Sequence, residues 1–234
     1  TRLSGYTLEP ALVSGLASAG IHVYTLGPLP TNGLAMLTKK MKANMGIMIT
    51  ASHNPINYNG IKIVKSKSQP LDEETDFKVI KKIAETAIFS SPSYRGIMAD
   101  RSDEARKAYV ETVLSFIDID KLSPLKIVVN SGNGAAGPAF DAIAEKLAEA
   151  NAPLEFIRIN HNPDHTFPNG VPNPLLPKNH FSTSEVVKEV GADFGVAFDG
   201  DFDRCFFFDE TGKFVQGEYI VGLLANIFLE RELG

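Results

Sequence analysis

Residues 125–137 read LKIVVNSGNGAAG, which predicts a buried strand followed by a glycine-rich turn. A helix is expected directly after this turn, at residues 138–150. The later elements are expected at residues 154–159 (strand), 182–190 (helix), 194–198 (strand), 205–208 (strand) and 217–230 (helix). Because strands that alternate with helices are typical of an α/β unit, we expect one such module over residues 121–234.

The same alternation is present upstream and predicts a second α/β module over residues 1–120. Its elements are expected as helices near residues 8–20, 34–41, 72–87 and 103–117 and strands at 21–26, 45–50 and 60–64. The boundary is expected in the proline-containing segment 118–124. The predicted fold class is therefore α/β, with two consecutive modules whose mixed sheets are sandwiched by helices. Residues 1–5 resemble the loop after a strand, so we expect the chain to begin inside a domain.

The composition limits the classes of function. Apolar residues make up 44% and charged residues 22% of the 234-residue chain, as in ordinary folded proteins. A net charge of −5, with no basic run longer than a lysine pair, argues against nucleic acid or a membrane surface as a partner. The longest apolar stretch, residues 219–229, is too short to span a bilayer. With only Cys205 and no secretory signal, we expect a cytoplasmic protein.

Residues 50–55 read TASHNP and follow an apolar strand. Ligands gather at the carboxyl ends of strands in α/β sheets, so Ser52 and His53 are placed where a site is expected. An ordinary turn is the alternative, because Ser, Asn and Pro fill turns for conformational reasons alone. A Ser-His-Asp triad fits poorly: adjacent side chains usually diverge, and no G-x-S-x-G elbow surrounds Ser52.

Residues 194–205 read FGVAFDGDFDRC and place Asp199, Asp201 and Asp203 at alternating positions after a strand. Three carboxylates this close repel one another unless they share a cation, and their hard oxygen ligands suit Mg²⁺. An EF-hand is rejected, because its sixth position requires glycine and is Arg204 here, and because strands flank the loop. Arg204 is expected to cover a metal-site carboxylate or to reach a phosphate.

Two further features are weaker. Gly132, Gly134 and Gly137 formally match a dinucleotide fingerprint, but the following strand lacks an acid near its end to hold a ribose. A tight strand-to-helix turn is the preferred interpretation, and a dehydrogenase is the enzyme class set aside. Lys62 lies on a short strand, where a single lysine is usually solvated.

Taken together, TASHNP, the NGIKI segment at residues 59–63 and FDGDFDR at residues 198–204 resemble the α-D-phosphohexomutase superfamily. The SGNGAAG turn and the loop FPNGVPNPLLP at residues 167–177 are most similar to its bacterial phosphomannomutase branch. The resemblance runs through the whole chain and identifies the modules with domains 1 and 2 of that family. It implies mixed sheets sandwiched by helices in both.

The resemblance also assigns roles. It implies that Ser52 carries a phosphoryl group and that Asp199, Asp201 and Asp203 hold Mg²⁺ together with that phosphoserine. Lys62 and His53 are implied to help with proton transfer, and Arg204 matches the arginine that follows the metal acids. Arg2 and Asn54 are implied to bind the substrate phosphate.

The implied reaction interconverts mannose 6-phosphate and mannose 1-phosphate through a hexose 1,6-bisphosphate. Phosphoglucomutase, phosphoglucosamine mutase and a non-catalytic binding protein on the same scaffold remain alternatives. Family members have four domains, so we expect this chain to be an incomplete fragment that folds without completing the cycle. The residues Pro30-Thr31-Asn32 also depart from the P-T-P turn of many relatives.

Overall fold

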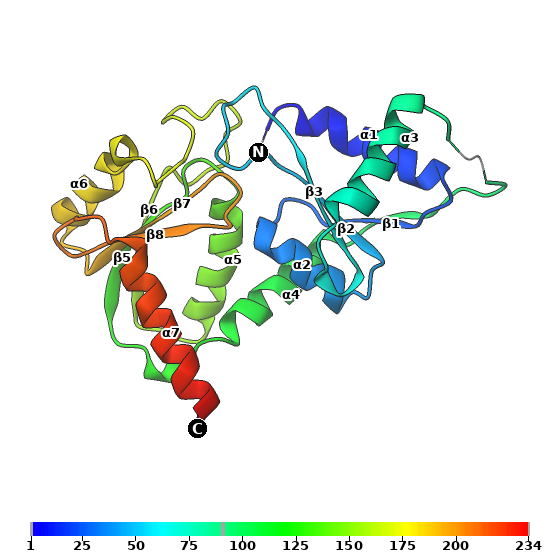
Figure 1. Ribbon diagram of the computed structural model, residues 1–234. Helices are drawn as coiled ribbons and strands as arrows, with labels where there is room; N and C mark the ends of the chain where they lie inside the picture. Colours follow the sequence, from blue (N-terminus) through cyan, green and yellow to red (C-terminus); the bar gives the residue numbers. More distant parts are fainter. Residues whose placement is uncertain (1, 90–91, 234) are drawn as a thin grey trace.

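The computed structural model describes residues 2–89 and 92–233. Figure 1 shows two modules side by side, the first with α1 to α4 and the second with α5, α6 and strands β5 to β8. The helices are α1 (Gly5–Ser18), α2 (Thr31–Lys40), α3 (Lys78–Thr86), α4 (Ser102–Leu114), α5 (Ala136–Glu149), α6 (Phe181–Val190) and α7 (Gly217–Leu233). The α/β class expected from the sequence is confirmed.

The first module contains two separate two-stranded sheets. The strand β1 (Val23–Thr25) pairs in parallel with β4 (Met98–Asp100), and β2 (Met45–Ile49) pairs antiparallel with β3 (Ile61–Lys65). The strand β4 was not expected, because three residues are too few to show a periodicity. The helix expected over residues 72–87 begins instead as a π-helical turn, Glu73–Phe77, before α3.

The second module is built on one mixed sheet of four strands in the order β6-β5-β7-β8. These are β5 (Leu125–Asn130), β6 (Leu154–Ile159), β7 (Phe194–Phe198) and β8 (Cys205–Phe208), of which only the β7–β8 pair is antiparallel. Ile127 and Val129 pack with Phe140 of α5, whereas Val128 packs with Val187 of α6. Alternate residues of β5 therefore face opposite helices, as expected for a strand buried on both sides.

The glycines of the turn after β5 are explained by close packing. A side chain at Gly132 would lie 2.4 Å from Pro172, and one at Gly137 would lie 2.0 Å from the carbonyl oxygen of His161. Gly132 also has a φ of +56°, a conformation that favours glycine. This agrees with a tight strand-to-helix turn, the interpretation preferred from the sequence.

The modules contact each other along α4 and α5, and side chains of Thr31, Thr50 and Ser52 bind acids of the loop after β7. A short 3₁₀ turn, Ile119–Lys121, separates α4 from β5, and the division at residues 120 and 121 stays a prediction. The last helix, α7, extends away from the second module (Figure 1) and exposes apolar side chains such as Tyr219 and Phe228. Throughout residues 2–89 and 92–233, every helix falls short of the length and apolar content needed to cross a bilayer.

Candidate active site

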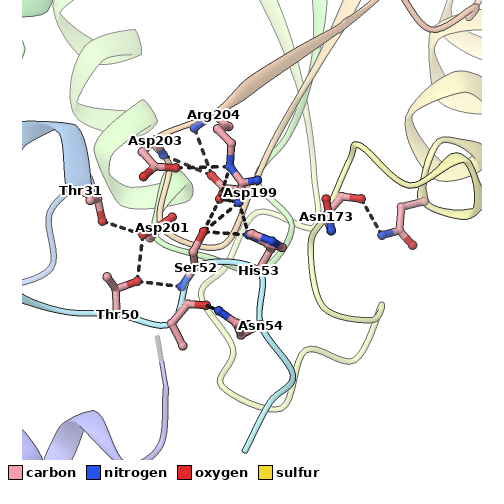
Figure 2. Close-up of polar contacts among 12 residues, drawn as sticks. Thr31, Thr50, Ser52, His53, Asn54, Asn173, Asp199, Asp201, Asp203 and Arg204 are labelled. Carbon is pink, nitrogen blue, oxygen red and sulfur yellow. Dashed lines mark hydrogen bonds and ion pairs between the residues drawn. The ribbon is translucent and has the colours of Figure 1, made fainter. Parts of the chain in front are cut away.

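The loop after β2 meets the loop after β7, as Figure 2 shows. The hydroxyl of Ser52 donates a hydrogen bond of 2.7 Å to Oδ2 of Asp199, although the two residues are 147 positions apart. Ser52 adopts a left-handed φ of +48°, which is unfavourable for a residue with a side chain. Its backbone N–H is held by Oγ1 of Thr50 at 3.0 Å, so the neighbouring strand end helps to maintain this conformation.

Asp199 is fully buried and is surrounded by donors. The Nε of Arg204 donates to its Oδ2 at 3.1 Å, and the backbone N–H groups of Asp203 and Arg204 each donate to Oδ1 at 3.2 Å. Burial raises the pKa of Asp199 above its usual value, and the nearby charge of Asp201 adds to that effect. The hydrogen bonds from Ser52 and Arg204 act against it.

Arg204 joins the two loops. Its Nη2 donates to Oγ of Ser52 at 2.8 Å and also contacts Nδ1 of His53. An arginine nitrogen can only donate, so this contact assigns Nδ1 of His53 as an acceptor. The sequence-based expectation that Ser52 and His53 diverge is wrong, because Oγ of Ser52 lies 3.1 Å from Nδ1 of His53. The left-handed backbone of Ser52 brings the adjacent side chains together.

Asp201 is held by the first module. The hydroxyls of Thr31 and Thr50 donate to its Oδ2 at 2.9 Å each, and Nζ of Lys62 donates to the same oxygen at 3.0 Å. The backbone N–H of Thr31, at the start of α2, donates to the Asp201 carbonyl at 3.0 Å, so the positive end of that helix also faces this acid. Burial alone would raise the pKa of Asp201, but these donors and the charge of Lys62 hold it well below its usual range.

Lys62 is an ion-pair partner, although its side chain remains 43% exposed, as is usual for a single lysine on a strand. Its Nζ lies 3.0 Å from Asp201 and 2.9 Å from Asp203. Partial burial lowers the pKa of Lys62, but the two carboxylates more than offset it, so the net shift is upward. Lys62 is therefore an ammonium at neutral pH.

The three acids fit a metal ion. One carboxylate oxygen from each of Asp199, Asp201 and Asp203 can be chosen so that all three lie within 4.8 Å of one another. Oδ1 of Asp201 is buried and has no hydrogen-bond partner among the described residues. A buried acceptor without a donor is costly, and a hard cation would satisfy it. The acids could thus hold a metal ion.

Arg2 supports residues 50–55, called here the serine loop. Its guanidinium donates to the carbonyl oxygens of Ser52, Asn54 and Pro55 at 2.8, 2.7 and 3.0 Å, and it lies over the ring of Phe167. The amide of Asn54 donates within the same loop, to Ala51. Both side chains donate to carbonyl oxygens of this loop, and their expected role in phosphate binding stays a prediction.

Thr31 and Thr50 were not identified from the sequence. Thr50 opens the TASHNP segment and Thr31 lies in the Pro30-Thr31-Asn32 turn, yet hydroxyl residues at such positions are common. Only the approach of the two modules shows that both hydroxyls bind one carboxylate of the second module.

The fold and the meeting of these loops define the class as the α/β phosphohexomutases, and the comparisons agree. Residues 1–88 match the model described as phosphoglucomutase/phosphomannomutase, alpha/beta/alpha domain I, and residues 107–212 match its domain II. The chain belongs to the phosphoglucomutase/phosphomannomutase family.

Its relatives carry names of the same kind. A phosphomannomutase of Salmonella montevideo is 47% identical over 233 residues, which cover all of this chain and 51% of that protein. A protein of Xanthomonas campestris pv. campestris named phosphohexose mutases is 46% identical over 235 residues and is 50% covered. A crystal structure of a phosphoglucomutase/phosphomannomutase family protein from Burkholderia thailandensis aligns with a TM-score of 0.83 at 29% identity, over 99% of this chain and 49% of that one. The chain thus spans about half the length of the curated relatives it matches.

Proposed function

We propose that this chain supplies the phosphoserine and metal-binding parts of a phosphomannomutase, which interconverts mannose 6-phosphate and mannose 1-phosphate. The proposal depends most on one observation: the 2.7 Å contact between Ser52 and the buried Asp199, which joins the two modules at their strand ends. Mannose is favoured over glucose because the Salmonella relative and several others are named phosphomannomutases. The cytoplasmic location expected from the sequence stays a prediction.

The proposed reaction starts from phosphorylated Ser52. A hydroxyl oxygen of the hexose monophosphate attacks the phosphorus, the bond between phosphorus and Oγ of Ser52 breaks, and Oγ keeps the electron pair. The proton of the attacking hydroxyl passes to a base near the serine, for which His53 is the proposed group. The resulting 1,6-bisphosphate reorients within the site, and its other phosphate is transferred to Ser52 by the reverse of these steps. The net change moves one phosphate between C6 and C1.

The charges around Ser52 suit this chemistry. Phosphoryl transfer is catalysed mainly by positioning and by stabilising negative charge. Arg204 donates to Oγ of Ser52, where charge develops as the bond breaks. Lys62 remains an ammonium, so it is proposed to neutralise phosphate charge and to assist proton transfer as a cation. A Mg²⁺ ion held by Asp199, Asp201 and Asp203 would supply further neutralisation of phosphate oxygens.

The substrate phosphate is proposed to contact Arg2 and Asn54, near the same loop. Arg2 is charged and reaches three carbonyls of residues 52–55, so it could shift to a phosphate only by releasing them. The anionic phosphate of a hexose phosphate suits a site with the cations Arg2, Lys62 and Arg204, and its hydroxyls can form hydrogen bonds there.

Intact-mass measurement after incubation with glucose 1,6-bisphosphate and Mg²⁺ tests the proposal. Wild type and Ser115→Ala, a control at an exposed serine of the first module, are expected to gain one phosphate, and Ser52→Ala none. Ser52→Ala should be less stable than wild type by about 1–3 kcal/mol, since it removes one donor to the buried Asp199, so all proteins are incubated well below the unfolding temperature of this variant. Phosphate on Ser52→Ala, or none on wild type, would contradict the assignment. The phosphorylated protein should then lose its phosphate faster to mannose 6-phosphate than to glucose 6-phosphate; the opposite order would favour a phosphoglucomutase.

A further inference from the structure

Gly200 lies in residues 199–204, called here the metal loop, where this loop contacts the serine loop. A Cβ built on Gly200 would lie 2.6 Å from the carbonyl oxygen of Ser52. Real Cβ atoms essentially never approach an atom within 3.0 Å, so no side chain fits between the two loops as they stand. The φ of Gly200 is not positive, so backbone strain would not add to this contact.

The carbonyl of Ser52 cannot easily move away from Gly200. It accepts a hydrogen bond of 2.8 Å from Nη2 of Arg2, whose side chain is only 6% exposed and also holds Asn54 and Pro55. A displaced Ser52 would lose this bond or move the whole loop with it. The serine side of the contact is therefore fixed by the first module.

The metal loop is also held on its other side, by the turn after β5 and the start of α5. The N–H of Ala135 donates to the Gly200 carbonyl at 3.1 Å, and a Cβ on Gly134 would lie 2.7 Å from that same oxygen. Phe202, two residues further on, packs with Ala136 and Ala139 at the start of α5. Gly200 is thus enclosed between Ser52 on one side and the turn after β5 on the other.

We propose that Gly200 is a positioning residue, which sets the distance between Ser52 and the metal-binding acids by bringing the two loops into backbone contact. The inference rests on the proposed function. An alanine would have to widen the gap from 2.6 Å to 3.4 Å, where ordinary van der Waals contact begins. A misplacement of catalytic groups by about 1 Å can lower the rate about 100-fold. A displacement of this size between Ser52 and Asp199 is therefore expected to slow phosphoryl transfer strongly.

The test compares Gly200→Ala with Gly15→Ala, a control in α1 where an added Cβ meets nothing within 4 Å. The maximal rate of Ser52 phosphorylation by glucose 1,6-bisphosphate should fall about 100-fold in Gly200→Ala, with little change in the half-saturating concentration, and should be unaffected in Gly15→Ala. Calorimetry should show nearly wild-type Mg²⁺ affinity in unphosphorylated Gly200→Ala, because all three acids belong to one loop. Hydrogen exchange at residues 51–54 should become faster, since the serine loop is displaced.

The outcomes separate the two proposals. If wild type takes up no phosphate, the proposed function fails; the exchange and calorimetry measurements still judge the role of Gly200 in holding the loops. Wild-type transfer rates or unchanged hydrogen exchange in Gly200→Ala would overturn the positioning role. A matching loss of Mg²⁺ affinity would also overturn it, because the alanine would then have damaged the metal loop itself.

Discussion

Replacing Arg2 by methionine should destabilise the first module by about 3–5 kcal/mol. The guanidinium donates three hydrogen bonds of 2.7–3.0 Å to loop carbonyls and is almost wholly buried. A hydrogen bond from a charged group contributes about 1.5–3 kcal/mol to stability. The expected loss is smaller than the sum for three such bonds, because the exposed carbonyls of Asn54 and Pro55 can form hydrogen bonds with water in the variant. Arg2→Lys should lose about 2 kcal/mol, since one ammonium cannot reach all three carbonyls.

Urea unfolding followed by circular dichroism measures this change, with the exposed Arg106→Met as the matched control. Hydrogen exchange of residues 51–56 should become faster in Arg2→Met and stay unchanged in Arg106→Met. A loss below about 1 kcal/mol, with the loop as protected as in wild type, would refute the bracing role. Such a result would favour the role in phosphate binding that the family resemblance implies, because that role predicts no change in stability or hydrogen exchange of the protein without ligand.

Two other changes test the metal site and the core. Asp201→Asn should weaken Mg²⁺ binding about tenfold or more in calorimetry, because a hard cation held by few protein ligands depends on each carboxylate. The control Asp209→Asn, on the turn after β8, should bind Mg²⁺ as wild type does. Equal affinities of the two variants would show that Asp201 is not a metal ligand. Val128→Ala should lower the unfolding free energy of the second module by about 2–3 kcal/mol, since Val128 is fully buried between sheet and helix. The control Val221→Ala, at an exposed position of α7, should change it by less than about 0.5 kcal/mol. Similar losses in both variants would show that Val128 is not a core residue.

Most of the second module could be predicted from the sequence. Continuous apolar runs such as LKIVVN and FGVAF predict strands that are buried on both faces, and β5 and β7 occupy those residues. The first module was harder to predict. Its strand β4 has three residues, and its pairing with β1 depends on a partner more than 70 positions away. Local patterns carry no information about such a pairing.

The candidate site divides in the same way. The alternating acids at residues 199–203 and the serine at a strand end are local signals, so the sequence alone predicts Asp199, Asp201, Asp203 and Ser52 as candidate site residues. The importance of Lys62 came only from the family resemblance, because one lysine on a strand is not distinctive. Its two ion pairs join residues 139 and 141 positions apart and exist only in the folded molecule.

The sequence by itself determined the α/β class, the strand ends with candidate site residues and the acidic loop, because each depends on residue types at short spacing. The tertiary structure alone decided that Thr31 and Thr50 hold Asp201, that Arg2 clamps the serine loop, and that Gly200 meets the carbonyl of Ser52. Those contacts depend on how the two modules dock. Docking is set by packing along α4 and α5 and by backbone approaches of a few ångströms, which no periodicity in the chain encodes.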